Sequence, residues 1–187
     1  MEKEIKAALR ASIDFLEANG FRYAIIGGIA LQYWGAVRNT YDIDFKVIVP
    51  DSDYAAVHAT LRAAFPKRGR PDLPKNPLIV DVTITNVIVD FLLALPGYEE
   101  LIIENAVRWN MNGWSAWVCS AEDLIIQKVV ARRGKDWLDV EALLIEQRGK
   151  LDESYIEDWL AQFAEALERP QMLTEYQSLL TKIKSVG

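Results

Sequence analysis

The point at which the sequence changes from a strand-like to a helical pattern restricts the fold most. Between residues 21 and 118, short runs of β-branched and aromatic residues alternate with glycine, proline and asparagine turns. From Ser120 onward, apolar residues recur at helical spacing. Because strands and helices occupy separate parts of the chain, the pattern predicts an α+β fold with a C-terminal helical appendage. We expect a core domain at 1–119 and a helical region at 120–187.

The predicted elements follow from periodicity and turn residues. Strands are expected at 21–26, 41–49, 78–85, 87–95, 107–111 and 114–118. Helices are expected at 3–18, at 29–33, from a Ser52 cap through 65, at 98–106, from a Ser120 cap up to Gly134, and at 136–147, 153–168 and 171–184. Asn112-Gly113 is the strongest hairpin signal, and residues 66–77 form a proline-rich loop of a length that is often functional.

The composition excludes several classes of protein. With 51% hydrophobic and 26% charged residues, the chain can bury a core, so disorder and coiled coils are excluded. The longest apolar run, 78–95, contains Asp81 and Asp90, which argues against a membrane span. The acidic start of the chain argues against a secretory signal. The single cysteine, Cys119, excludes an internal disulfide, and we expect a cytoplasmic protein.

The distribution of charge argues against a generic DNA-binding protein. Residues 1–135 hold 16 basic and 16 acidic side chains, so the whole net charge of −6 lies in 136–187. A DNA-binding surface would need a positive footprint. Two basic clusters remain, which are either solvated faces or phosphate contacts. They comprise Lys67, Arg68, Arg70 and Lys75 in the proline-rich loop, and Arg132, Arg133 and Lys135 near a helix end.

Two short motifs near the N-terminus carry the chemistry. Gly27-Gly28 lies between a predicted strand and a predicted helix, where a ligand phosphate could approach backbone N–H groups. Asp42 and Asp44 flank Ile43 on a predicted strand, so their carboxylates point to the same side. Two neighbouring carboxylates call for a cation, and oxygen ligands suit Mg²⁺, with Mn²⁺ as the alternative.

These motifs, taken together, resemble the nucleotidyltransferase superfamily that includes DNA polymerase β. Ile26-Gly27-Gly28 followed by Asp42-Ile43-Asp44 matches its pattern, which also requires a third carboxylate on a later strand. The segments 26–30 and 38–44 look like AbiEii-type (MenA-like) toxin nucleotidyltransferases, in which Arg-x-Thr precedes the acidic pair. The resemblance implies a polymerase-β-like core, a mixed sheet with flanking helices. One position departs from it: Gly28 stands where serine is frequent, so a hydroxyl contact to phosphate is lost.

The third carboxylate is expected at Asp90. This residue lies within the apolar segment 88–92, where an unpaired charge would be costly and a metal partner would account for it. Asp81, on the preceding predicted strand, is the rival. The family pattern favours the later strand.

The resemblance implies a role for each of these residues. Asp42, Asp44 and Asp90 would hold two metal ions, and Asp90 would also accept the proton of the attacking hydroxyl. Pyrophosphate would leave from a nucleoside triphosphate. The predicted nucleotide ligands are Gly27, Gly28, Arg38, Thr40 and Lys128. The helical Lys128 is equally compatible with a solvated side chain.

The acceptor of the nucleotide is left open by the sequence. The toxin resemblance implies an RNA or tRNA 3′ end as the hydroxyl acceptor and an antitoxin protein as a partner. Antibiotic nucleotidyltransferases of the aminoglycoside or lincosamide type use the same chemistry, and the acidic tail would favour such a cationic acceptor. A third hypothesis is a non-catalytic nucleotide-fold binding protein, against which the three carboxylates argue.

Overall fold

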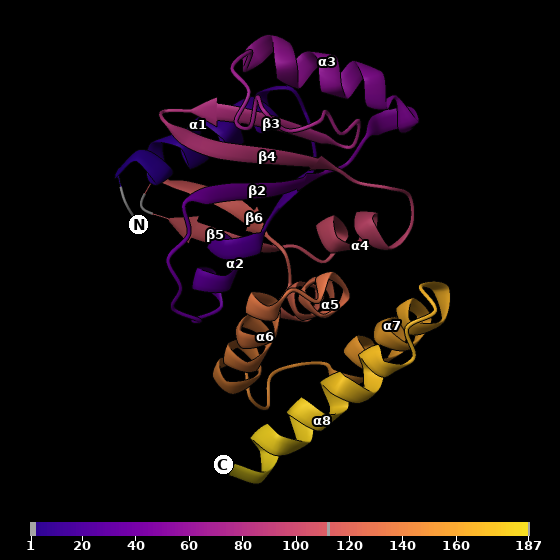
Figure 1. Cartoon of the computed structure of the whole chain (residues 1–187). Helices are drawn as coiled ribbons and strands as arrows, with labels where there is room; N and C mark the ends of the chain where they lie inside the picture. The colour runs from indigo at the N-terminus through magenta and orange to yellow at the C-terminus, as the bar shows by residue number, and fades with distance from the viewer. Residues whose placement is uncertain (1–2, 112, 187) are drawn as a thin grey trace. The chain divides into compact units, whose positions relative to one another are not determined.

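A computed structural model describes residues 3–111 and 113–186 of the chain (Figure 1). The chain forms two compact units. The first unit takes in the chain up to residue 30 and residues 39–119. The second unit comprises residues 31–38 and the chain from 120 on. Residues 31–38, which the sequence assigned to the core domain, therefore group with the C-terminal helices.

The first unit is built on a mixed sheet, as expected for the α+β class. Its strand order, among the described residues, is β3-β4-β2-β1-β6-β5. The bounds are β1 Tyr23–Ile26, β2 Asp42–Val47, β3 Ile79–Ile84, β4 Val87–Leu93, β5 Val107–Met111 and β6 Trp114–Val118. Strand β2 runs parallel to β4 and β1 runs parallel to β6, whereas the other neighbouring strands are antiparallel.

The helices follow the predicted ranges closely. In the first unit they are α1 Lys3–Ala18, α3 Tyr54–Ala64 and α4 Tyr98–Glu104. In the second unit they are α5 Ala121–Ala131, α6 Gly134–Glu146, α7 Glu153–Ala166 and α8 Gln171–Val186. The division between the units runs through α2, Gly27–Tyr33. None of the helices in the described part of the chain combines the length and apolar character that a membrane span requires.

Two local predictions need comment. The predicted Ser52 cap is wrong, because residues 50–52 form a 3-10 turn and Asp53 instead accepts the backbone N–H of Ala56 at 2.9 Å. An Asp carboxylate caps a helix as well as a Ser hydroxyl, so the sequence alone could not choose between neighbours. In the predicted Asn112-Gly113 turn, Asn112 lies outside the described residues, and Gly113 has a positive φ of 84°.

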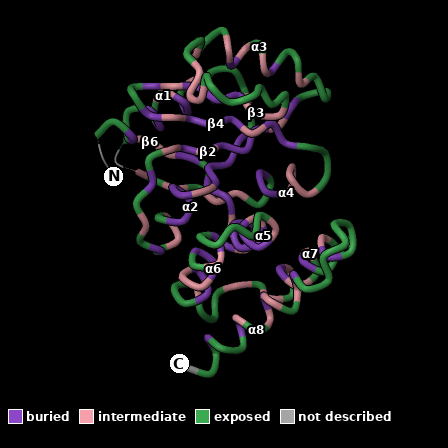
Figure 2. Tube along the Cα trace, in the orientation of Figure 1, coloured by how far each residue is buried: buried purple, intermediate pink, exposed green. Residues whose placement is uncertain are grey.

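The core of the first unit lies around the central strands, which run through buried surroundings in Figure 2. Phe45 of β2 and Phe91 of β4 are fully buried and stack with their ring centroids 5.5 Å apart. Phe65, just after α3, extends this stack over Phe91 at 5.9 Å. Helix α1 adds an apolar face in which Leu9 and Leu16 are fully buried. These contacts fix β2 against β4 and hence the polar residues that alternate with the core residues.

We expect Phe91→Ala to lower the free energy of unfolding by about 3–5 kcal/mol, because it removes a fully buried ring and leaves a cavity between two aromatic neighbours. Leu73→Ala, at a side chain that is 56% exposed in the same unit, should change it by less than about 0.5 kcal/mol. Urea unfolding followed by circular dichroism measures both values.

Candidate active site

Strand pairing brings four carboxylates to one face of the sheet in the first unit. Asp44 and Asp90 are direct neighbours across the parallel β2–β4 pair, and Asp90 faces Asp81 across the antiparallel β3–β4 pair. Asp42 lies two residues before Asp44 and therefore shares its side. We call Asp42, Asp44, Asp81 and Asp90 the carboxylate face. The predicted trio of Asp42, Asp44 and Asp90 thus lies together, as the proposed metal chemistry requires.

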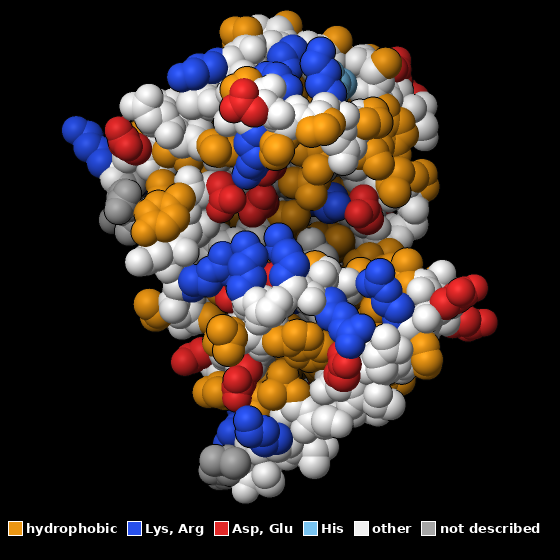
Figure 3. All heavy atoms as spheres, in the orientation of Figure 1, with side chains coloured by type: hydrophobic (Ala, Val, Ile, Leu, Met, Phe, Trp, Pro, Cys, Tyr) orange, Lys and Arg blue, Asp and Glu red, His pale blue; other side chains and the backbone are white. Residues whose placement is uncertain are grey.

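The carboxylate face is neutralised by an arginine that the sequence had not singled out as a site residue. Arg70, in the loop 66–77, places its Nη1 atom 2.5 and 2.6 Å from the two oxygens of Asp90. Its Nη2 atom is 3.6 Å from Asp42. Like charges aligned across strands repel one another, so a cation among them is stabilising. Figure 3 shows acidic and basic side chains gathered together on the visible face of this unit.

Asp81 is occupied by three arginines and serves as an anchor for the loop. Its carboxylate accepts hydrogen bonds from the side chain of Arg68 at 3.1 and 3.2 Å and from the backbone N–H of Arg70 at 2.7 Å. Arg62 of α3 lies 3.8 Å away. Asp81 thus has more fixed donors than Asp90, which favours Asp90 over Asp81 as the third metal ligand.

The two neighbouring aspartates have opposite pKa shifts. Burial raises the pKa of Asp90, and although the hydrogen bond and charge of Arg70 oppose this shift, they do not outweigh it. Burial also opposes ionisation of Asp81, but there the backbone N–H of Arg70 and the side chain of Arg68 prevail and lower the pKa. Asp81 is therefore the carboxylate that the protein itself holds charged.

A buried lysine lies further along the same face. Lys46 is two residues after Asp44 in β2 and is only 5% exposed. Its ammonium group donates to the Glu99 side chain of α4 at 2.8 Å. Glu99 in turn accepts the backbone N–H of Leu95 at 2.8 Å. The sequence showed Lys46 only as an alternating strand residue, because its partner is more than fifty positions away.

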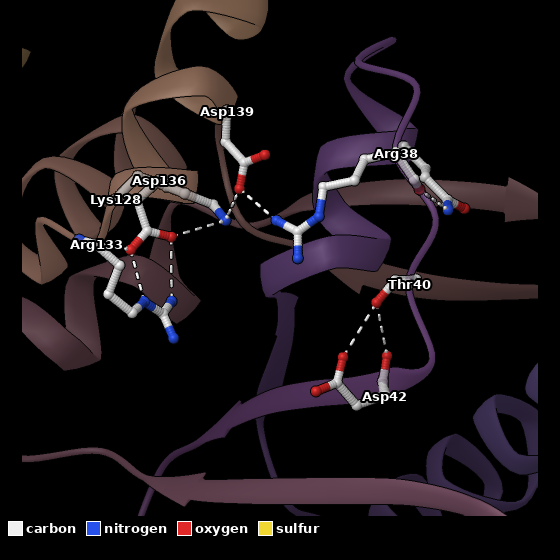
Figure 4. A network of polar contacts seen from close by, with 8 residues as sticks. Arg38, Thr40, Asp42, Lys128, Arg133, Asp136 and Asp139 are labelled. Atoms are coloured by element: carbon white, nitrogen blue, oxygen red, sulfur yellow. Dashed lines mark hydrogen bonds and ion pairs between the residues drawn. The ribbon is translucent and has the colours of Figure 1, made fainter.

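The two glycines make room for the side chains of the site. Gly27 has a φ of +63°, and a Cβ atom there would overlap the carboxylate of Asp44. A Cβ atom at Gly28 would overlap the side chain of Thr40. The Thr40 hydroxyl lies 3.2 Å from the carbonyl and 3.1 Å from the carboxylate of Asp42 (Figure 4). The glycines therefore let the residues before and within β2 pack against the start of α2.

The donor set fits a divalent cation. Asp42, Asp44 and Asp90 offer carboxylate oxygens, the ligands that Mg²⁺ prefers, on two adjacent paired strands. The position of Arg70 shows independently that this face requires positive charge. As they stand in the described part of the chain, no three acidic, histidine or cysteine side chains are grouped so that they could hold a metal ion. The guanidinium contacts two of the three proposed ligands instead.

The two predicted cationic ligands lie in the second unit and share one aspartate. Arg38 donates to Asp139 at 2.6 Å, and the buried Lys128 donates to the same oxygen at 2.5 Å (Figure 4). Lys128 also lies 3.5 Å from Asp136, which Arg133 holds through its side chain and its backbone N–H. Lys128 is thus a paired, buried lysine, not a solvated one.

The most buried carboxylate of this network is held in its charged form. Asp136 has no exposed surface. Burial opposes its ionisation, but the hydrogen bonds from Arg133 and the charges of Lys128 and Arg133 lower its pKa. In the sequence, Lys128 lies on a helix with apolar residues on most sides and is followed by aspartates at 136 and 139, a pattern that is compatible with a buried ion pair but does not fix which way the lysine faces.

The comparison with family models decides the class of the protein. A family described as nucleotidyl transferase of unknown function (DUF2204) matches residues 5–177. The chain belongs to the DUF2204 family. This nucleotidyl transferase assignment confirms the enzyme class predicted from Gly27-Gly28 and Asp42-x-Asp44, although the match does not extend to the AbiEii-type toxins.

Solved structures share the fold of this DUF2204 protein. A nucleotidyltransferase-like antigenic protein from Paracoccidioides brasiliensis has a TM-score of 0.52 and 17% identity over 91% of each chain. The solution structure of the antibiotic-resistance factor ANT(2'')-Ia has a TM-score of 0.51 at 15% identity, and the alignment covers 99% of this chain and 94% of the ANT(2'')-Ia chain. A crystal structure of ANT(2'')-Ia in complex with adenylyl-2''-tobramycin has a TM-score of 0.53 at 15% identity, and the alignment covers 87% of this chain and 99% of that structure's chain. No curated protein matched the chain.

Gly27 and Gly20 of the DUF2204 protein form a matched pair for testing the packing of Asp44. Both have positive φ, at 63° and 70°, but a Cβ atom at Gly20 meets nothing within 4 Å. Alanine should cost about 1–2 kcal/mol of unfolding free energy at either position through backbone strain. Gly27→Ala should cost about 1–3 kcal/mol more, because it must displace Asp44. Equal losses in urea unfolding would contradict this packing.

Asp136→Asn tests the buried ion pairs of the second unit. At pH 7 it should lower the free energy of unfolding by about 3–5 kcal/mol, because Arg133 and Lys128 each lose a charged contact with this buried carboxylate. The folded-state pKa of Asp136 is lowered, so its contribution is present above the unfolded pKa of about 3.9 and is lost as pH falls through the folded value. The difference from wild type in urea unfolding should therefore shrink below about pH 4. The exposed Asp158→Asn is the control.

Proposed function

We propose that the protein is a metal-dependent nucleotidyltransferase that transfers a nucleoside monophosphate from a nucleoside triphosphate to a hydroxyl acceptor. The observation that carries this proposal is the alignment of Asp42, Asp44 and Asp90 on one face of β2 and β4, beside Gly27 and Gly28. Three carboxylates so placed repel one another unless a cation joins them. In a nucleotidyl transferase, such a cation would bind the phosphate groups of the nucleotide.

The chain's own residues divide the work. Asp42 and Asp44, both partly exposed, would hold the ion that accompanies the triphosphate. Asp90, which is 9% exposed, would serve as a ligand of the second ion and would accept the proton of the attacking hydroxyl. Gly27 and Gly28 bind phosphate through their N–H groups, and Thr40 holds the Asp42 backbone and carboxylate. Mg²⁺, or Mn²⁺ in its place, would supply charge neutralisation for the phosphate oxygens when bound.

Arg38 and Lys128 remain proposed phosphate ligands on the strength of the sequence motif. Each donates to Asp139, so contact with a nucleotide would require that it exchange this partner or use its remaining donors. Arg38 is the more accessible of the two, with a side chain 33% exposed against 8% for Lys128. We therefore propose that the main role of Lys128 is to position Asp139 and, through it, Arg38.

Two sources of the acceptor hydroxyl are each supported by one observation. The Arg38-x-Thr40-x-Asp42 motif resembles toxin nucleotidyltransferases and favours an RNA or tRNA 3′ end, with an antitoxin protein as partner. The fold shared with ANT(2'')-Ia and the net charge of −6 favour a small cationic acceptor such as an aminoglycoside. A cytoplasmic location and the identity of the preferred nucleotide stay predictions.

Incubation with each labelled nucleoside triphosphate and Mg²⁺, together with total tRNA or a panel of aminoglycosides and lincosamides, tests this function. Wild type should label one acceptor class and release pyrophosphate. Asp44→Asn should lower turnover by at least about a hundredfold, because it removes a carboxylate from the proposed metal site. The products are separated by gel electrophoresis for RNA and by mass spectrometry for the small molecules.

Asp72→Asn is the matched control, because Asp72 is an exposed carboxylate in the loop 66–77 and should leave turnover unchanged. Label on RNA supports the toxin-like acceptor, and label on a drug supports the small-molecule acceptor. Turnover that survives both chelation by EDTA and the Asp44→Asn change would contradict metal-dependent transfer at this face.

A further inference from the structure

Arg70 occupies the carboxylates that the proposed function reserves for metal. We infer that the loop 66–77 is a tethered counter-ion: Arg70 closes the metal site while no divalent ion is bound, and it must leave Asp90 before that residue can ligate an ion. This inference rests on the proposed function, since it concerns the same carboxylates. It assigns a role to the first of the two basic clusters of the sequence.

The loop reaches the site because its backbone pairs with the outer strand β3. The N–H of Thr83 donates to the carbonyl of Lys67 at 2.9 Å, and the N–H of Gly69 donates to the carbonyl of Asp81 at 3.3 Å. A Cβ atom at Gly69 would come within 2.8 Å of the Val82 carbonyl oxygen and 3.0 Å of Ile88. The approach of the loop to the strand therefore requires a glycine at this position.

Arg68 fastens the loop, and Arg70 follows it over the sheet. The Arg68 side chain binds Asp81 and also donates to the carbonyls of Pro71 and Leu73, both at 3.2 Å, which shapes the turn beyond Arg70. The N–H of Arg70 is bound to Asp81 at 2.7 Å. With its own backbone fixed on Asp81, Arg70 extends its side chain across the sheet to Asp90 and Asp42.

The contact competes directly with metal binding. Both oxygens of Asp90 accept from the same guanidinium nitrogen, and Asp42 faces the neighbouring nitrogen. Both oxygens of Asp90 are thus engaged by Arg70, and an ion shared with Asp44 would have to compete with the guanidinium for them. The Arg70 side chain is 31% exposed, so it has open solvent into which it can turn once a divalent ion replaces its charge.

Arg62 offers a matched control for Arg70. It belongs to the same unit, its side chain has a similar exposure of 26%, and it interacts with Asp81, but it makes no contact with Asp90 or Asp42. Arg62→Gln and Arg70→Gln therefore remove one positive charge each from the same neighbourhood. Only Arg70→Gln frees the proposed metal ligands.

The experiment is a titration of the full-length proteins with Mn²⁺, in which free ion is measured by electron paramagnetic resonance without nucleotide. Arg70→Gln should bind Mn²⁺ on the order of tenfold more tightly than wild type, the ratio expected when a charge-assisted hydrogen bond no longer competes. Arg62→Gln should stay within about twofold of wild type, and Asp90→Asn should bind more weakly.

Thermal unfolding supplies a second measurement that does not depend on activity. In EDTA, Arg70→Gln should melt below wild type, because its carboxylates then repel without a counter-ion. At saturating Mn²⁺ this difference should disappear, since the ion replaces the guanidinium charge. A melting temperature that is equally low with and without Mn²⁺ would mean that Arg70 only holds the loop in place, and would overturn the inference.

The outcomes separate the inference from the function on which it rests. If Arg70→Gln binds Mn²⁺ no more tightly than wild type while Asp90→Asn binds it more weakly, the metal site stands and the tethered counter-ion is wrong. Equal tightening in Arg62→Gln would also overturn it, because a general loss of positive charge would then suffice. If no variant binds Mn²⁺, the proposed metal-dependent function fails and the inference fails with it.

Discussion

Repulsion between aligned carboxylates is the constraint on which the first unit depends. Asp44, Asp90 and Asp81 lie side by side across three strands, and Asp42 stands on the same face. Such a row destabilises a sheet unless its charge is compensated, and here the compensation comes from arginines of α3 and of the loop 66–77. The arginines that stabilise the outer strands therefore also neutralise the carboxylates that are proposed to bind a cation.

The positive charge that compensates the aspartates is distributed unequally among them. Asp81 receives hydrogen bonds from the Arg68 side chain and the Arg70 backbone N–H and is held charged, whereas Asp90 has one arginine and a raised pKa. A carboxylate with several fixed donors acts as a structural anchor. A neighbour with one movable donor can exchange it for another cation. This difference distinguishes Asp81, the structural anchor, from Asp90, the proposed metal ligand.

The sequence allowed the site to be predicted where periodicity governs the structure. An alternation of two places Asp42 and Asp44 on one side, and an apolar run around Asp90 marks a buried strand, so the carboxylates could be grouped before any coordinates. Arg70 could not be predicted, because a proline-rich loop has no period and its course is set by Asp81, more than ten residues away. Lys128 was ambiguous for a related reason: helix α5 is apolar on most sides, so its pattern does not say which face is buried.

The row of aspartates also bears on how the sheet assembles. If β2 slipped by one residue along β4, Asp42 and Asp44 would turn toward the side occupied by Phe91, and Phe45 would leave that side. Buried charges without partners are among the most unfavourable arrangements in a protein. The same carboxylates that form the candidate site therefore also disfavour a wrong register between these strands.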